Sequence, residues 1–552
     1  MGFDNWIQLQ GLAIPNLVST QVEQNPAVQS TTDQAVPLIS SSSFGEIRKL
    51  FNHSSHYLLG LMGKVGLGFI SLPIFTRVFS VADYGLIDFG TKILLLLTAL
   101  SKMGLQNSAL RWFDEKHFSS CREDASRYYS TMFFGALFTS VLVALVFLGF
   151  CESVLKHRIQ SYMLTIMVFV AGMTVIRAIQ SMLWSFMRIE ERTKAYNISM
   201  VAGKMAMIGA ICLLLPWLGR AAKSYFSGAL AAEISLALVL TAILVRRGVL
   251  SLLHFDWRLL GAGILFGGPL IFYEISTIVL DAGDRVLVTH YLGVNPLGIY
   301  SVAYGLSAQV NDLLIFPLNL ALFPIYMRLW TTRGQQATAD FLSTCLEIFI
   351  LVAAGVCAIV AVSVRDGVVL LASSKYAGAR PLIPVIVIGL LIYTMHVFLC
   401  AGLLIHKKTG TMAVVLFCSA AVNVALNCYL LPSTGLMGAA FATLVSYAFC
   451  VALLGWASNR YLSLRIRWGS ICKCTIAAAL IALAVSRIEL KPLVLNLAAR
   501  SLVAGVLYCG VLYVLEPRIH AFVRGVMWRR MRPPCESTWT YPIPTADTGK
   551  SS

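Results

Sequence analysis

Charged residues are scarce in this chain. Asp, Glu, Lys and Arg make up 12% of its 552 residues, whereas they form roughly a quarter of an average soluble domain. Hydrophobic residues make up 58%, and the mean hydropathy is +0.76. These values exclude an ordinary soluble protein and predict a polytopic membrane protein.

The sequence also lacks the motifs on which several enzyme classes depend. It contains no Walker-type nucleotide-binding loop, no HExxH pair and no nucleophile elbow. No connection between its apolar runs exceeds about 25 residues, which is too short for a catalytic domain outside the membrane. We therefore expect no enzyme activity, no ATP-driven pumping and no cofactor.

The thirteen cysteines form no recognisable framework. Most lie inside apolar runs, and only Cys472 and Cys474 are close together. A lone C-x-C is weak evidence for a metal site, whereas cysteine is common as a small apolar residue of buried helices. We expect neither structural disulfides nor a bound metal.

The formal net charge of +17 does not indicate nucleic-acid binding, because the basic residues lie in short segments between apolar runs. Alternate connections between the apolar runs lie on the same side of the membrane. The even-numbered connections and both termini together carry about 25 Lys and Arg residues, whereas the odd-numbered connections carry about 11. Basic residues are enriched on the cytoplasmic side of membrane proteins. This bias predicts that both termini are cytoplasmic.

The apolar runs predict an all-α protein with about 14 transmembrane helices, each of about 20 residues. The predicted spans are 57–79, 86–106, 128–150, 161–184, 196–215, 223–245, 259–283, 297–323, 341–363, 381–405, 411–431, 436–457, 471–487 and 493–515. They divide the chain into a disordered cytoplasmic tail, a first six-helix bundle, a second six-helix bundle, helices 13 and 14, and a basic cytoplasmic tail. The corresponding ranges are 1–50, 51–250, 251–460, 461–517 and 518–552.

A repeated segment relates the two bundles. The stretch from Asp284 to Tyr304 contains VLVTHYLGVNPLGIY, and a weaker copy of its core occurs at 76–90 as TRVFSVADYGLIDFG. Val81, Gly85 and Leu86 correspond to Val294, Gly298 and Ile299, an offset of 213 positions. Six spans separate the copies, so both halves have the same orientation. We expect a pseudo-twofold axis along the membrane normal and a cavity between the halves.

Ionisable residues inside the predicted spans are the candidate functional residues, since charge at membrane depth costs several kcal/mol unless it lines a polar cavity or is paired. Lys64 and Lys204 lie deep, with Lys64 roughly 10 Å along its helix. Arg177 and Lys92 lie nearer helix ends, where long side chains can also reach the interface. The carboxylates at depth are Asp88, Glu233, Glu274, Asp312 and Glu347, which either bind a coupling cation or proton, neutralise a nearby base, or stay protonated.

Two segments, LPIFTRVFSVADYGLIDFG at 72–90 and IVLDAGDRVLVTHYLGVNPLGIYSVAYG at 278–305, resemble the multidrug/oligosaccharidyl-lipid/polysaccharide exporter superfamily. Within it, the chain is similar to the bacterial polysaccharide transporter, or O-antigen flippase-like, family. The resemblance implies a protein of the bacterial inner membrane that moves undecaprenyl-diphosphate-linked oligosaccharide from the cytoplasmic to the periplasmic leaflet. Its implied partners are that lipid and membrane lipids, with a polysaccharide polymerase and glycosyltransferases as further candidates; nucleic acid is not expected.

The candidate substrate-binding residues are predicted from this resemblance and from how deep each residue lies in its predicted span. Related flippases hold the headgroup in a basic cavity, so the predicted substrate-binding residues are Lys64, Lys204 and Arg285, followed by Arg177 and Lys92. Only Arg285 is supported by a motif match, and it could instead pair with Asp284 or Asp281. The predicted ion-coupling residues are Glu274, Asp312 and Asp88.

Four other functions remain open at this point. A drug/cation antiporter of the same superfamily predicts an acidic cavity, and a lipid II flippase predicts an essential gene. A membrane glycosyltransferase or polymerase would usually need a long catalytic loop, and none is visible. A scaffold for a polysaccharide assembly complex gives no reason to keep Lys64 and Lys204 at depth.

Overall fold

The computed structural model describes residues 63, 66–113, 121–155 and 161–515. All regular elements within these ranges are helices, which confirms the all-α prediction. A helix satisfies its own backbone hydrogen bonds, and this is what a segment in hydrocarbon requires.

The described part of the chain holds twelve helices that are long and apolar enough to cross a membrane. The helices of the first half are α3 (Val81–Lys102), α4 (Leu105–Trp112), α6 (Arg122–Phe150), α7 (Ser161–Ile189), α8 (Thr193–Leu218) and α9 (Ala222–Arg246), with the π-helical turn η1 (Cys151–Leu155). Those of the second half are α10 (Trp257–Leu292), α11 (Val294–Leu371), α12 (Leu382–Thr394), α13 (His396–Leu399), α14 (Ala401–Ile405), α15 (Thr409–Thr434) and α16 (Leu436–Asn459), with the 3-10 turns η2 (Leu252–His254) and η3 (Ser374–Ala379). The last two helices are α17 (Trp468–Val485) and α18 (Leu493–Leu515).

Each of the fourteen predicted spans overlaps a helix. The first falls on a shorter apolar helix, Gly66–Val78, and its beginning lies outside the described residues. The eighth and ninth both fall on α11, which is interrupted at Gly334, where φ is 76°. This left-handed conformation suits glycine, because it has no Cβ.

Local sequence signals fix where the central helices begin. Ser80 caps α3 by accepting a hydrogen bond from the backbone N–H of Asp83 at 3.0 Å. The Asp256 carboxylate caps α10 by accepting from the backbone N–H groups of Arg258 and Leu259. Such side chains satisfy backbone donors that the first turn leaves unpaired.

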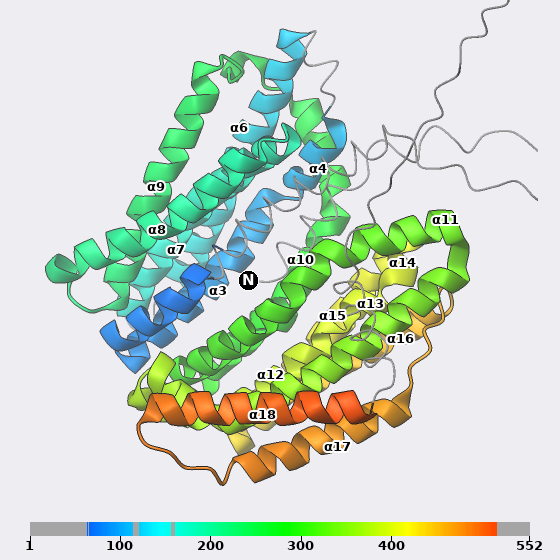
Figure 1. Cartoon of the computed structure of the whole chain (residues 1–552). Helices are drawn as coiled ribbons and strands as arrows, with labels where there is room; N and C mark the ends of the chain where they lie inside the picture. The colour runs from blue at the N-terminus through cyan, green and yellow to red at the C-terminus, as the bar shows by residue number, and fades with distance from the viewer. Residues whose placement is uncertain (1–62, 64–65, 114–120, 156–160, 516–552) are drawn as a thin grey trace, which may run out of the picture.

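Corresponding helices of the two halves pack in the same way. In the first half α3 packs against α7, and α7 against α9; in the second half α11 packs against α12, and α12 against α16. The pair α8 and α9 corresponds in the same manner to α15 and α16. Figure 1 shows α6 to α9 of the first half on one side and α11 to α16 of the second half on the other, with α3 and α10 between them.

The two copies of the repeat touch each other where α3 and α11 begin. A Cβ atom on Gly85 would overlap the carbonyl oxygen of Val294, and one on Gly298 would overlap the carbonyl oxygen of Val81. Because Val81 corresponds to Val294 and Gly85 to Gly298, the contact is reciprocal, as a twofold relation requires. The repeat is therefore also an interface between the halves.

Helices α17 and α18 lie along α11 and outside the two bundles (Figure 1, orange). The hydroxyl of Tyr508 on α18 donates to the carbonyl oxygen of Leu351 on α11 at 2.7 Å, and its ring covers Gly355. The other faces of these helices expose leucine and valine, among them Leu480, Leu483, Leu502 and Val514. Apolar exposure of this extent fits contact with lipid.

We expect Gly298→Ala to loosen the contact between α3 and α11. The new methyl group has no space beside Val81, and overpacking of this kind typically costs about 1–3 kcal/mol. Thermal unfolding in detergent should therefore shift to a lower midpoint. Gly172→Ala is the matched control, since a Cβ on Gly172 of α7 meets nothing within 4 Å; equal midpoints for the two variants would contradict the role given to Gly298.

Candidate functional site

Five charged side chains gather where α3 faces α10, and we call them the charge cluster: Asp88, Lys92, Asp281, Asp284 and Arg285. Asp88 and Lys92 stand four residues apart on α3, and Asp281 and Arg285 stand four apart on α10. This spacing places each pair on one helix face. The cluster therefore joins the first half of the protein to the second.

Arg285 is the centre of the charge cluster and is 1% exposed. Its Nη1 lies 2.7 Å from Oδ1 of Asp284, and the same nitrogen donates to the backbone carbonyl of Asp281. Its Nε lies 3.6 Å from a carboxylate oxygen of Asp88. The guanidinium also stacks 3.8 Å from the ring centre of Tyr304. These contacts compensate for the loss of water around a buried cation.

The carboxylates of the cluster are in turn held by hydroxyl groups. Tyr300 of α11 and Thr443 of α16 both donate to Asp284. Ser301 donates to Asp88 at 2.8 Å, and these two residues are again 213 positions apart. The hydrogen bond therefore joins equivalent positions of the two repeats.

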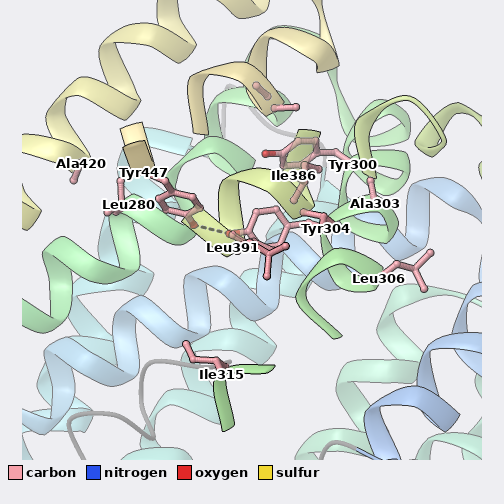
Figure 2. Close-up of a cluster of buried hydrophobic side chains, with 14 of the residues drawn as sticks. Leu280, Tyr300, Ala303, Tyr304, Leu306, Ile315, Ile386, Leu391, Ala420 and Tyr447 are labelled. Carbon is pink, nitrogen blue, oxygen red and sulfur yellow. Dashed lines mark hydrogen bonds between the residues drawn. The ribbon is translucent and has the colours of Figure 1, made fainter. Parts of the chain in front are cut away.

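Lys92 and Asp281 form the more accessible edge of the cluster. Lys92 Nζ lies 3.4 Å from Asp281 Oδ2, with 16% and 31% of the two side chains exposed. Asp281 also accepts a hydrogen bond from the hydroxyl of Tyr304 at 2.6 Å. Tyr304 is hydrogen bonded to Tyr447 of α16 at 2.7 Å, and Figure 2 shows these two rings next to Leu280 and Leu391.

The charge cluster holds more negative than positive groups. Three carboxylates, Asp88, Asp281 and Asp284, face two cations, Lys92 and Arg285, so the fully ionised cluster has a charge of −3 + 2 = −1. Such a group could bind one further cation or proton at its accessible edge.

Two other candidate residues form ion pairs with partners that are not members of the charge cluster. Arg177 of α7 makes a bidentate contact with Glu233 of α9, with hydrogen bonds of 2.8 to 3.2 Å. Glu274 of α10 receives a 2.7 Å hydrogen bond from Lys102, and both are buried. Lys204 and Asp312 are half-buried on α8 and α11. Lys64 lies outside the described residues.

A family model described as polysaccharide biosynthesis protein matches residues 51–330, just over half of the chain. The chain belongs to the polysaccharide biosynthesis protein family. A succinoglycan biosynthesis transport protein, ExoT, of Rhizobium meliloti is 23% identical over 294 residues, or 52% of this chain and 56% of that one. An uncharacterized membrane protein of Methanocaldococcus jannaschii is 22% identical over 246 residues, or 44% of this chain and 47% of that one. The chain thus spans about half the length of the curated relatives it matches.

Solved structures share the fold of this polysaccharide biosynthesis protein. The lipid II flippase MurJ in an inward closed conformation superimposes with a TM-score of 0.65 at 12% identity, covering 84% of this chain and 99% of that one. An inward-facing multidrug resistance transporter of the MATE family, within the MOP superfamily, gives a TM-score of 0.54 at 14% identity, with 77% and 95% covered. The fold implied by the resemblance, that of the multidrug/oligosaccharidyl-lipid/polysaccharide exporter superfamily, is confirmed.

Three of the residues that pair with the candidates are not predicted from the sequence. Lys102, which is 5% exposed, lies near the end of a predicted span. Tyr304 and Tyr447 lie in apolar runs, where tyrosine is usually an interfacial or core residue. One sequence signal could have identified the charge cluster and its tyrosines. Asp281 and Arg285 are four residues apart, and Tyr300 and Tyr304 lie in the same copy of the repeat.

We expect Asp284→Asn to destabilise the protein by about 3 kcal/mol or more, because it removes one of two carboxylates that compensate a buried guanidinium. Thermal unfolding in detergent measures the loss. The variant Asp284→Asn/Arg285→Gln should recover part of it, since the uncompensated cation is then absent. Asp340→Asn, at an exposed position of α11, is the control, and an equal effect of Asp284→Asn and Asp340→Asn would refute the pairing energy assigned to Arg285.

Proposed function

We propose that this protein moves an undecaprenyl-diphosphate-linked oligosaccharide, a repeat unit of O-antigen, capsule or exopolysaccharide, from the cytoplasmic to the periplasmic leaflet. The family match to polysaccharide biosynthesis proteins is the observation that carries the proposal. The printed role of the Rhizobium meliloti relative, succinoglycan biosynthesis transport, supports the same class of cargo. The proposed location is the bacterial inner membrane, with both termini cytoplasmic, and the reaction is transport without chemical conversion.

The chemistry of such a cargo fits a two-bundle protein with charged groups at its junction. A diphosphate and a hydrated glycan cannot cross about 30 Å of hydrocarbon unaided. The polyprenyl chain, in contrast, never needs to leave the lipid. A polar route between the halves that opens sideways to lipid serves both parts of the molecule.

We assign one contact with the diphosphate to Lys92. Its partner Asp281 is the most exposed carboxylate of the charge cluster, so the ion pair can open without uncovering Arg285. A phosphate oxygen would then take the place of Asp281 at the Lys92 ammonium group. Lys64, Lys204 and Arg177 are proposed as further contacts along the route, and Arg285 as the group that positions Asp88 and Asp281.

Alternating access follows from the interface between the halves. In the proposed orientation α3 and α11 begin on the periplasmic side, so the reciprocal contact of Gly85 and Gly298 closes the halves there. At the opposite end of α3, Gly104 packs directly on the backbone of Gly267 in α10. The transport cycle would separate these two contacts in turn.

The membrane potential is a proposed energy source. An inside-negative potential contributes about 2.3 kcal/mol per charge per 100 mV, so two negative charges that leave the cytoplasm gain roughly 4–5 kcal/mol. Asp88, Glu274 and Asp312 are proposed to add ion exchange. Of these three residues, Asp88 belongs to the charge cluster, which has a net negative charge.

The same net negative charge supports one second candidate function. A drug/cation antiporter would use the accessible edge of the cluster to bind a cationic substrate. The two functions differ in their cargo, and transport assays therefore distinguish them directly. A lipid II flippase would differ only in the headgroup carried.

We expect Lys92→Gln to lower the initial rate of flipping about tenfold or more, because a hydrogen bond to a charged group contributes about 1.5–3 kcal/mol. The measurement uses proteoliposomes that contain undecaprenyl-diphosphate-linked oligosaccharide, with lectin accessibility as the readout. Lys223→Gln removes an exposed cation from the same half and should leave the rate unchanged.

Results of three kinds would count against this assignment. Equal rates for Lys92→Gln and Lys223→Gln would remove Lys92 from the route. Transport of cationic dyes without glycolipid flipping would favour the antiporter, and flipping of lipid II alone would favour the peptidoglycan precursor as cargo.

We further expect that the initial flipping rate falls when the membrane potential is collapsed. Valinomycin with equal potassium on both sides of the proteoliposome removes the potential and leaves the cargo unchanged. A rate that is insensitive to valinomycin would exclude voltage as a driving force, while a residual rate that depends on a proton or sodium gradient would indicate ion exchange.

A further inference from the structure

A pocket with a volume of about 570 Å³ lies far along the chain from the charge cluster, where the loop between α17 and α18 meets α11 and the beginning of α12. Its lining includes three basic side chains: Arg365 of α11, Arg380 next to α12, and Lys491 of the loop. Because α17 ends at Val485 and α18 begins at Leu493, the pocket stands at the ends of membrane-spanning helices, where lipid headgroups lie.

Buried polar side chains build the floor of this pocket. Asp366 of α11 lies 3.7 Å from Arg500 of α18 and accepts a 2.7 Å hydrogen bond from Asn496. These three residues are 4–7% exposed. Arg500 also donates to the backbone carbonyls of Ile488 and Ser486. The loop is thus fixed to α18 by hydrogen bonds, and the pocket is a shaped part of the fold.

The pocket carries an excess of positive charge. The lining residues Arg365, Arg380, Lys491, Asp366 and Glu489 carry a net charge of +1, and Arg500, which lies beside Asp366, raises it to +2. The Asp366 charge is neutralised by Arg500. Glu489 pairs with Arg365 at 3.4 Å, but both side chains are more than 60% exposed, and such pairs contribute little. The Nε of Arg380 is shielded from solvent and has no hydrogen-bond partner in the described structure.

Apolar side chains surround the basic residues. Leu490 and Leu493 line the pocket, and they continue into Val494 and Leu495 on the first turn of α18. All four are exposed. Cationic groups beside an exposed apolar surface match a ligand with an oxyanion and a hydrocarbon chain, since guanidinium groups bind phosphate oxygens in pairs and the leucines offer a surface for the chain.

We propose that this pocket binds the phosphate group of an anionic membrane lipid. Arg365, Arg380 and Lys491 hold the phosphate, and the hydrocarbon chain lies along Leu493 and Leu495. The site is separate from the charge cluster, and the inference does not depend on the proposed transport function. Bound lipid would attach the α17–α18 pair and α11 to one another at the membrane surface.

The experiment titrates the purified full-length protein in detergent with phosphatidylglycerol and counts bound lipids by native mass spectrometry. An ion pair that involves an exposed basic side chain contributes up to about 1 kcal/mol, or about fivefold in affinity. We therefore expect Arg365→Gln/Lys491→Gln, at two exposed positions, to bind phosphatidylglycerol about 25-fold more weakly. Glu489→Gln should bind it more tightly, because it removes a competing carboxylate.

The matched control is Arg487→Gln/Arg460→Gln, which removes two exposed cations outside the pocket and should leave the affinity unchanged. Equal affinity of the pocket variant and the wild type would overturn the proposal, and so would equal binding of phosphatidylcholine. Thermal unfolding of each variant shows whether the fold is retained.

Two further titrations identify the source of the phosphate. Leu493→Gln should weaken binding of phosphatidylglycerol. Inorganic phosphate should not bind at Arg365 and Lys491, so that Arg365→Gln/Lys491→Gln leaves its binding unchanged. A site that takes inorganic phosphate with the same dependence on these residues is an oxyanion site and not a lipid site. Binding of undecaprenyl diphosphate without phosphatidylglycerol would assign the pocket to that lipid instead of a bulk membrane lipid.

Discussion

The structure depends on how a fully buried guanidinium is accommodated inside a membrane protein. Arg285 cannot keep its water, so it needs carboxylates, a carbonyl group and an aromatic face around it. The partners come from α3, α10 and α11, and these helices must therefore meet at one place. The requirement of one cation thus organises the junction between the two halves.

The duplication explains the form of this junction. Val81 and Gly85 contact Val294 and Gly298 across a pseudo-twofold relation. The bundles pack internally through α3, α7 and α9 and through α11, α12 and α16, while buried apolar residues of both halves join in one continuous cluster. The proposed transport cycle would therefore have to repack the apolar contacts between the halves as well as the glycine contacts.

Charge is distributed differently at the two sites that we assign. The charge cluster is compact, has one negative charge in excess and lies between the halves, where the proposed transport cycle would change its ion pairing. The pocket beside α18 has two positive charges in excess and lies on a fixed floor of Asp366, Asn496 and Arg500. A mobile junction suits transport, and a fixed basic pocket suits permanent attachment of a lipid phosphate.

The sequence by itself determined the helices, their approximate bounds and the duplication, because apolar length and the spacing of 213 residues are properties of the chain alone. It also selected Asp88 and Lys92 as ionisable residues within a predicted span and Arg285 from its motif, without showing that the three belong together. Only the tertiary structure decided that Lys92 faces Asp281, 189 positions away, that Arg177 faces Glu233, and that Glu274 faces Lys102. The physical reason is that helix formation in hydrocarbon is satisfied locally by each segment, whereas the partner of a buried charge is chosen by how distant helices pack.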